Sequence, residues 1–302
     1  MSNAKTHPGV VMGIDRSDSA GTAVRWAARE AILRHVALTL VPVQPWPAFG
    51  SFARLLATAP TVDELHQWRE DEVRRIFSDA IKSIEDDADG GNVPEINTDL
   101  LYSAHVPTLV DMSMEAQVVV VGCRGQAAQD DRGPLGSVST SLVHLAHCPV
   151  AVIHDEGDSG SLPSVHLPVL VGIDGSAGSQ LATEIAFQEA SWRRVELVAL
   201  HAWSDGDAST MPTVEWSALQ SKARETLEEG LAGWQECYPD VKVRRIVVYN
   251  EPAHHLLNQS QSAQLLIVGS RGRGGHPGML LGSVATGVVK AVGVPVIVAR
   301  HD

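Results

Sequence analysis

The chain carries the same short motifs twice in the same order, and this internal repeat limits what it can fold into. The segment 11–31 reads VMGIDRSDSAGTAVRWAAREA, and the segment 171–190 reads VGIDGSAGSQLATEIAFQEA. VVVVGCRG at 118–125 returns as LLIVGSRG at 265–272. The matched pairs include Asp15 with Asp174, Ser17 with Ser176, Ala23 with Ala182, Ala27 with Ala186, and Glu30 with Glu189. A repeat of about 150 residues makes each copy a domain rather than a solenoid unit.

A segment rich in glycine, serine and acidic residues, DEGDSGSLP at 155–163, separates the two copies and is typical of a linker. We therefore expect a first domain over 1–155, a linker over 156–165 and a second domain over 166–302.

The charge balance argues against several classes of function. The chain has 36 acidic and 23 basic residues, a net charge of −13, which disfavours binding to nucleic acid or to anionic membranes. Its apolar runs are shorter than the roughly 18 residues of a membrane span. Three cysteines without a CxxC or HExxH motif favour a reduced protein without a metal cage, so we expect a cytoplasmic location.

Each copy alternates strand-like and helix-like segments. In the second copy, the β-branched run 168–173 predicts a strand covered on both faces, and helical spacing of apolar residues predicts a helix over 177–194. Further elements are expected at 195–201 (strand), 215–237 (long helix), 241–249 (strand), 252–261 (helix), 264–269 (strand), 282–292 (helix) and 295–300 (strand). The first copy has strands near 9–15, 37–43, 94–101, 117–122 and 149–154. This alternation predicts an α/β fold of two doubly wound domains in tandem, each with a mostly parallel sheet.

The strongest functional signal is a glycine-rich loop after the fourth strand of the second copy. Gly269-Ser-Arg-Gly272 is followed, after nine residues, by Gly282–Ser283 at a helix start. Glycines let an anion approach the main chain, and free N–H groups at a helix start favour a phosphate. Added positive charge would come from Arg271, Arg273 and His276. The loop has neither the P-loop lysine nor the third glycine of a dinucleotide fingerprint, and a plain tight connection is the alternative.

The pattern Gly269-x2-Gly272-x9-Gly282-Ser283, with Asp174 closing the first strand and a final Pro295–Val296 strand, resembles the ATP-binding branch of the universal stress protein family. GIDGS at 172–176 and LHAW at 200–203 are similar to its tandem members, and the resemblance covers 9–154 and 166–300. It implies two tandem Rossmann-like domains, each with a five-stranded sheet of order 3-2-1-4-5, that bind ATP with Mg²⁺ or Mn²⁺. It also implies that the last strands, 149–154 and 295–300, meet in an internal pseudo-twofold pair, with a further homodimer left open.

Carried over by position, the resemblance implies a nucleotide site in each copy. In the second domain it would comprise Asp174, Ala202, Gly269, Arg271, Gly272, Gly282, Ser283 and Val284. In the first domain it would comprise Asp15, Pro45, Gly122, Gly125, Gly136, Ser137 and Val138. The aspartate would lie at the base-and-ribose end, and the helix start would hold the phosphates.

The first copy departs from this pattern. Its loop, QAAQDDRGPL, is one residue longer and carries Asp130 and Asp131, which would repel a triphosphate unless a divalent cation intervened. Pro45 is aligned with Ala202 and offers a carbonyl but no N–H. We therefore expect the first site to bind ATP more weakly or to be empty.

Plainer interpretations accompany these. The two aspartates, and likewise Ser137 and Ser283, could simply cap the helices that follow. His144 and His147 share a helix face but have no further ligand in sequence, which disfavours a metal site. The tryptophans near the first helix and second strand of each copy are expected in the core or between domains: Trp26, Trp46, Trp192 and Trp203.

We find no catalytic constellation in the sequence. The leading hypothesis is an ATP-binding stress-response or regulatory protein, rather than an enzyme, in which nucleotide occupancy tunes conformation or partner binding and hydrolysis is slow at most. The alternatives are an adenine-nucleotide α-hydrolase type of enzyme and a nucleotide-free tandem scaffold for other proteins.

Overall fold

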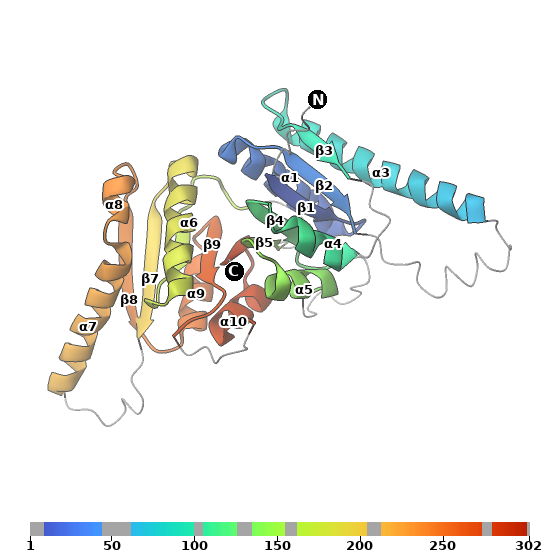
Figure 1. Ribbon diagram of the computed structural model, residues 1–302. Helices are drawn as coiled ribbons and strands as arrows, with labels where there is room; N and C mark the ends of the chain where they lie inside the picture. The colour runs from blue at the N-terminus through green and yellow to red at the C-terminus, as the bar shows by residue number, and fades with distance from the viewer. Residues whose placement is uncertain are drawn as a thin grey trace, which may run out of the picture.

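The computed structural model describes residues 9–43, 62–99, 105–125, 135–154, 162–203, 213–273 and 280–300. Their ten strands form one sheet that runs through the molecule from β3 to β8 (Figure 1). The strands are β1 (Val10–Ile14), β2 (Leu38–Pro42), β3 (Ile96–Thr98), β4 (Val118–Gly122), β5 (Val150–Ile153), β6 (Val169–Gly172), β7 (Leu197–Trp203), β8 (Val243–Tyr249), β9 (Leu265–Gly269) and β10 (Val296–Ala299). The helices are α1 (Asp18–Arg34), α3 (Val62–Ala88), α4 (His105–Met112), α5 (Ser137–Leu145), α6 (Ala177–Arg193), α7 (Thr213–Leu231), α8 (Trp234–Cys237), α9 (Pro252–Ser260) and α10 (Ser283–Ala291).

The strand order, β3-β2-β1-β4-β5-β10-β9-β6-β7-β8, contains the order 3-2-1-4-5 twice, once from each end. Pairs within each half are parallel, whereas β5 and β10 pair antiparallel, with Ile297 opposite Ala151. The predicted meeting of 149–154 with 295–300 is confirmed. This pairing joins the two five-stranded sheets into a single ten-stranded sheet, which the sequence did not predict.

Two hydrophobic clusters lie on opposite faces of this sheet. Side chains alternate between them along a strand, as in β1, where Met12 joins one cluster and Val11 the other. Helices α1, α3, α6 and α7 cover the first face, and α4, α5, α9 and α10 cover the second. The inner strands, such as β1, β4 and β5, are therefore buried on both faces, as their β-branched composition predicts, whereas the edge strands β3 and β8 are half-buried to exposed.

Two elements differ from the sequence-based expectation. The predicted helix over 215–237 is broken: α7 ends at Leu231, Gly233 adopts a φ of +80°, and the one-turn α8 begins at Trp234. Only glycine adopts that φ without strain, so Gly233 marks the break. Of the third strand of the first domain, expected near 94–101, the described residues 94–99 contain Ile96–Thr98 as strand.

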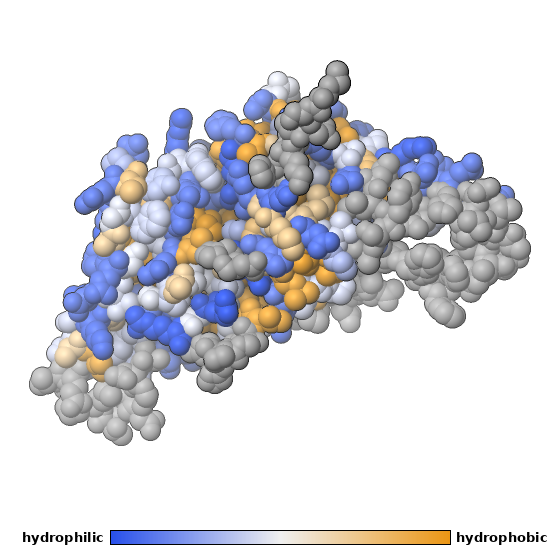
Figure 2. Space-filling view, in the orientation of Figure 1, coloured by the Kyte–Doolittle hydropathy of each residue, from blue (hydrophilic) through white to orange (hydrophobic). Residues whose placement is uncertain are grey.

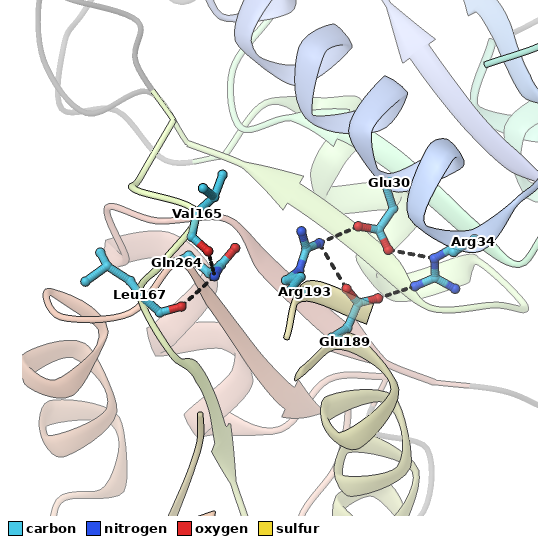
Figure 3. A network of polar contacts seen from close by, with 7 residues as sticks. All are labelled: Glu30, Arg34, Val165, Leu167, Glu189, Arg193 and Gln264. Carbon is cyan, nitrogen blue, oxygen red and sulfur yellow. Dashed lines mark hydrogen bonds and ion pairs between the residues drawn. The ribbon is translucent and has the colours of Figure 1, made fainter. Parts of the chain in front are cut away.

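A buried cluster of four charged residues joins the domains where α1 meets α6 (Figure 3). Arg34 contacts Glu30 on its own helix and Glu189 on α6, both at 2.6 Å. Arg193 contacts Glu189 at 2.9 Å and also reaches Glu30. Both carboxylates are fully buried. The cluster follows the pseudo-twofold symmetry of the repeat, because each arginine forms an ion pair with one glutamate of its own domain and one of the other domain.

The pKa values of the two glutamates shift in opposite directions. Burial alone would raise the pKa of Glu30, but the charges of Arg193 and Arg34 hold it below its usual range. Burial and the neighbouring Glu30 carboxylate raise the pKa of Glu189.

Tryptophans flank this cluster, as expected for residues between domains. The guanidinium of Arg34 lies 5.0 Å from the ring centroid of Trp192, and that of Arg193 lies 5.8 Å from the ring centroid of Trp26. Trp203 is buried in the second domain, and Trp46 lies outside the described residues. Nearby, Gln264 donates hydrogen bonds to the carbonyls of Val165 and Leu167 and so holds the chain that enters β6 (Figure 3).

The outer surface is mainly hydrophilic on its flanks, while hydrophobic residues gather towards the middle of the molecule in the view of Figure 2. This middle region is where β5 and β10 join the domains. Each of the two buried hydrophobic clusters contains residues of both domains, so the apolar interior is continuous across the domain junction.

Candidate functional site

A cavity opens in the first domain at the carboxyl ends of β1 and β4, against the start of α5. Its empty volume is about 370 Å³ with the open solvent at its mouth included, and the space open to the centres of water-sized molecules is about 60 Å³. Six of the seven residues predicted for this domain line it: Asp15, Gly122, Gly125, Gly136, Ser137 and Val138. The other lining residues are Gly13, Val43, Val121, Arg124 and Ser139. The seventh predicted residue, Pro45, lies outside the described residues.

Two hydrogen bonds to main-chain carbonyls hold the start of α5 against the glycine loop. The Gly136 amide donates to the Cys123 carbonyl at 2.8 Å, and the Ser139 hydroxyl donates to the Gly122 carbonyl at 2.6 Å. The N-cap position is Gly136, which has no side chain with which to cap the helix. The predicted capping by Ser137 is wrong, because this serine is the first helical residue. The first N–H groups of α5 are therefore available to an anion in the cavity.

The start of α10 repeats this arrangement in the second domain. Gly282 is the N-cap, and its amide donates to the Ser270 carbonyl at 2.7 Å. Ser283 is the exposed first helical residue, so its predicted capping role is also wrong. Both α5 and α10 thus have a glycine at the N-cap position.

The two aspartates lie where the first strand of each domain ends. Asp15 Oδ1 accepts hydrogen bonds from the Ser17 amide (2.9 Å) and the Ser17 hydroxyl (2.5 Å). Asp174 accepts from the Ser176 amide at 2.9 Å and from the Arg273 amide at 3.0 Å. The N-cap residues of α1 and α6 are the serines, so the aspartates shape the turn before each helix rather than cap it.

Asp174 also connects two loops of the second domain. Burial would raise its pKa, but the hydrogen bonds from Ser176 and Arg273 lower it, so the carboxylate is ionised. The Arg273 guanidinium lies over the turn at Gly175, where a Cβ would stand 2.5 Å from Nη2. The β6–α6 turn and the loop after β9 are thereby joined at the candidate site.

Comparison with known proteins identifies the family. The sequence model of the universal stress protein family matches residues 9–154 and 167–300. The chain belongs to the universal stress protein family.

Close relatives share the tandem organisation. Universal stress protein Rv2623 of Mycobacterium tuberculosis is 48% identical over 302 residues, covering 100% of this chain and 99% of the relative. Universal stress protein Rv2005c of the same organism is 47% identical over 308 residues, covering all of both chains. The crystal structure of a universal stress protein from Archaeoglobus fulgidus has a TM-score of 0.68 at 19% identity, covering 98% of this chain and 99% of that one. These findings establish two tandem universal stress protein domains with a Rossmann-like α/β fold.

In this universal stress protein, strand pairing corrects one predicted equivalence. Gly13 of β1 pairs with Val41, and its counterpart Gly172 of β6 pairs with Leu200. Two residues further along, Val43 is therefore the counterpart of Ala202. The alignment that matched Pro45 with Ala202 is displaced by two residues. Val43 lines the cavity, and its amide donates to the Ile14 carbonyl at 2.6 Å.

The remaining residues predicted for the second domain gather at the same end of the sheet. Ala202 lies near the end of β7, paired with Val248. Gly269 ends β9 so close to α6 that a Cβ would lie 2.6 Å from the carbonyl carbon of Gly178. Arg271 and Gly272 follow it and are exposed, and Val284 is half-buried in the first turn of α10. Residues 274–279, with His276, and 126–134, with Asp130 and Asp131, lie outside the described residues.

Two residues that line the cavity, Arg124 and Ser139, were not predicted, although their positions in the repeat could have indicated them. Arg124 aligns with Arg271 in the repeated GCRG and GSRG motifs, yet only Arg271 was assigned to a site. Ser139 lies one helical turn after Gly136, where its hydroxyl reaches back to the loop, and the second domain has Ala285 there. Val43 was hidden by the displaced alignment.

Two further features concern the described ranges: metal-binding groups and membrane-spanning helices. They contain no group of three or more histidine, cysteine, aspartate or glutamate residues that could hold a metal ion. His144 Nδ1 lies 2.7 Å from the Thr140 carbonyl on its own helix. No helix in the described part of the chain has both the length and the apolar character to cross a membrane.

Proposed function

We propose that this universal stress protein binds ATP at the cavity of the first domain and at the corresponding end of the second, and that nucleotide occupancy tunes its conformation or its choice of partner. The observation that carries the proposal is the cavity itself, which combines the uncapped start of α5, the glycine loop and the guanidinium-bearing Arg124. The proposal places the protein in the cytoplasm, the compartment that its cysteine content favours.

The charges of the cavity would orient the nucleotide. Asp15 stands at one wall and would repel phosphates, while its oxygens can accept hydrogen bonds from ribose hydroxyls. Arg124 and the N–H groups at the start of α5 also line the cavity and offer positive charge. The phosphates would therefore lie at the α5 end, and the base and ribose towards β1 and Val43.

A divalent cation fits this arrangement only as part of the nucleotide. Among the described residues, the cavity wall offers one carboxylate, Asp15, so Mg²⁺ or Mn²⁺ would take most of its ligands from phosphate oxygens and water. The cation would offset the negative charge that the phosphates bring to the site.

The experiment is isothermal titration with ATP and Mg²⁺ of three proteins: wild type, Ser137→Glu and Ser283→Glu. Each substitution places a carboxylate at the exposed first residue of α5 or α10, where a phosphate would lie, and should weaken that domain's site by at least about tenfold. A glutamate at a helix start also favours the helix, so both variants should fold. The wild type should bind two ATP per chain, and each variant one.

The matched control is Ser141→Glu, which adds the same charge to α5 one turn beyond Ser137. It should leave both affinities close to those of the wild type. Absence of binding in the wild type contradicts the proposal and favours the scaffold alternative, and stoichiometric release of AMP and pyrophosphate favours the hydrolase alternative.

A further inference from the structure

Besides the pairing of β5 with β10, the residue that directly follows each of these two strands contacts a helix of the other domain. Arg300 follows β10 in the second domain, and its Nη1 donates to the Val143 carbonyl in α5 of the first domain at 2.5 Å. His154 follows β5 in the first domain, and its ring hydrogen-bonds to the Val289 backbone in α10 of the second. The two contacts are equivalent, because Val143 and Val289 occupy the same position in the repeat, seven residues after Gly136 and Gly282.

Both contacts are made to the last turn of a helix, where carbonyl groups lack partners within the helix. If α5 continued, the Val143 carbonyl would accept from the His147 amide, but this amide donates to the Ser113 hydroxyl at 2.8 Å. Arg300 takes that place and brings a positive charge to the negative end of the helix dipole. The opposite end of the same helix, about 13 Å away, is the start at Gly136 that lines the cavity.

The two contacts differ in charge. Arginine is always protonated, whereas burial and the nearby charge of Arg124 lower the pKa of His154 to about 4. His154 Nε2 is buried without a hydrogen-bond partner in the described part of the chain, which fits a neutral ring. The first domain's helix is thus held by a cation, and the second domain's helix by a neutral donor.

We propose that Arg300 and His154 are positioning residues for the phosphate site of the opposite domain, each holding in place the helix whose start forms that site. This inference rests on the proposed function. Each helix is fixed at its end by the other domain and presents its start to its own ligand. Removing Arg300 from the second domain should therefore weaken the site of the first.

The test measures ATP affinity one site at a time, with Ser283→Glu leaving the first domain's site and Ser137→Glu leaving the second's. In the Ser283→Glu background, Arg300→Met should raise the Kd for ATP by about fivefold or more. In the Ser137→Glu background, the same change should leave the Kd unaltered. In the Ser137→Glu background, His154→Leu should raise the Kd by a smaller factor than Arg300→Met does in the other, because the lost hydrogen bond is neutral.

Two further variants separate positioning from a general effect. Arg300→Lys keeps the charge and a donor, and should restore most of the affinity. Arg244→Met removes an equal charge from the exposed pair that Arg244 makes with Glu196 on the far side of the second domain, and should change neither site. Equal loss at both sites, no loss, or the same loss with Arg244→Met would overturn the inference.

Hydrogen exchange on the same proteins distinguishes this inference from the proposed function. In Arg300→Met, the amides of α5 should exchange faster while those of α10 stay as in the wild type. If neither single-site background binds ATP, the proposed function fails, and the exchange pattern still decides the positioning role: uniform or unchanged exchange would overturn it.

Discussion

After β4 the Ser139 hydroxyl donates a hydrogen bond to the Gly122 carbonyl, whereas after β9 the equivalent position is Ala285, which has no hydroxyl. At the ends of β1 and β6, by contrast, Asp15 and Asp174 each accept a hydrogen bond from the serine amide two residues further on. The main chain of the site is thus repeated, while at least one side chain that holds it is not. Identical substitutions at equivalent positions should therefore have unequal effects.

The largest difference is expected at the buried cluster between α1 and α6. Glu30→Gln removes an ionised partner from two buried arginines and should destabilise the protein by about 3–5 kcal/mol. Glu189→Gln replaces a carboxyl whose pKa is raised with a neutral group of the same shape, and should cost less than about 1 kcal/mol. Urea unfolding at pH 7 compares the two, and equal losses would show that the proton belongs to neither glutamate in particular.

The next effect concerns pH. Because burial lowers the pKa of His154 from 6.5 to about 4, the unfolded chain takes up the proton first as the pH falls. Its contribution to stability is therefore complete above pH 6.5 and is lost towards pH 4, amounting to about 3 kcal/mol. His154→Gln should flatten the stability profile in this window, whereas Arg300→Lys, at the equivalent position, should not. Parallel profiles for wild type and His154→Gln would contradict this.

A third comparison concerns the glycines that face the two aspartates. A Cβ at Gly272 would overlap Asp174 Oδ2, the atom that accepts from the Arg273 amide, whereas at Gly125 it would lie 3.1 Å from Asp15 Oδ2. Gly272→Ala should therefore cost about 1–3 kcal/mol, and Gly125→Ala less. Thermal unfolding measures both, and a larger loss for Gly125→Ala would reverse the comparison.

The smallest effect is expected at Ser139. Ser139→Ala should cost about 1 kcal/mol, because the Gly122 carbonyl loses the hydroxyl that donates to it. Ser141→Ala, which removes a hydroxyl bonded within the same helix, is the control and should be close to neutral. If both variants unfold at the same urea concentration as the wild type, the Ser139 bond does not hold the loop of the first domain.

Much of the fold could be read from the repeat. Its motifs predict two domains of one kind, and the β-branched runs identify the buried strands. The charged cluster could not be read in this way. Glu30 and Glu189 are visible as a matched pair, yet charged residues on a helix ordinarily face water, and only the packing of α1 against α6 buries them. The end of α7 was missed because a single glycine within a helical pattern does not reveal its φ.

At the site, glycine and aspartate positions were predictable because they follow strand ends in a repeated pattern. The counterpart of Ala202 in the first domain was not predictable, because aligning Trp46 with Trp203 displaced it by two residues. The pairing of β1 with β2, compared with that of β6 with β7, identifies it as Val43. Because Pro45 is not the counterpart of Ala202, its missing N–H no longer argues against ATP binding in the first domain. The longer loop with Asp130 and Asp131 is the remaining reason to expect weaker ATP binding there.

The antiparallel pairing of β5 with β10 has a consequence for aggregation. A separate copy of either domain would present a four-residue strand of apolar residues, β5 or β10, as an open sheet edge, whereas here each such edge is covered by the other copy at fixed stoichiometry. The outer edges that remain are the three-residue β3 and β8, which carries Arg244 and Arg245. A short strand and a charged one are poor templates for further strand addition, so the tandem arrangement ends the growth of the sheet at both sides.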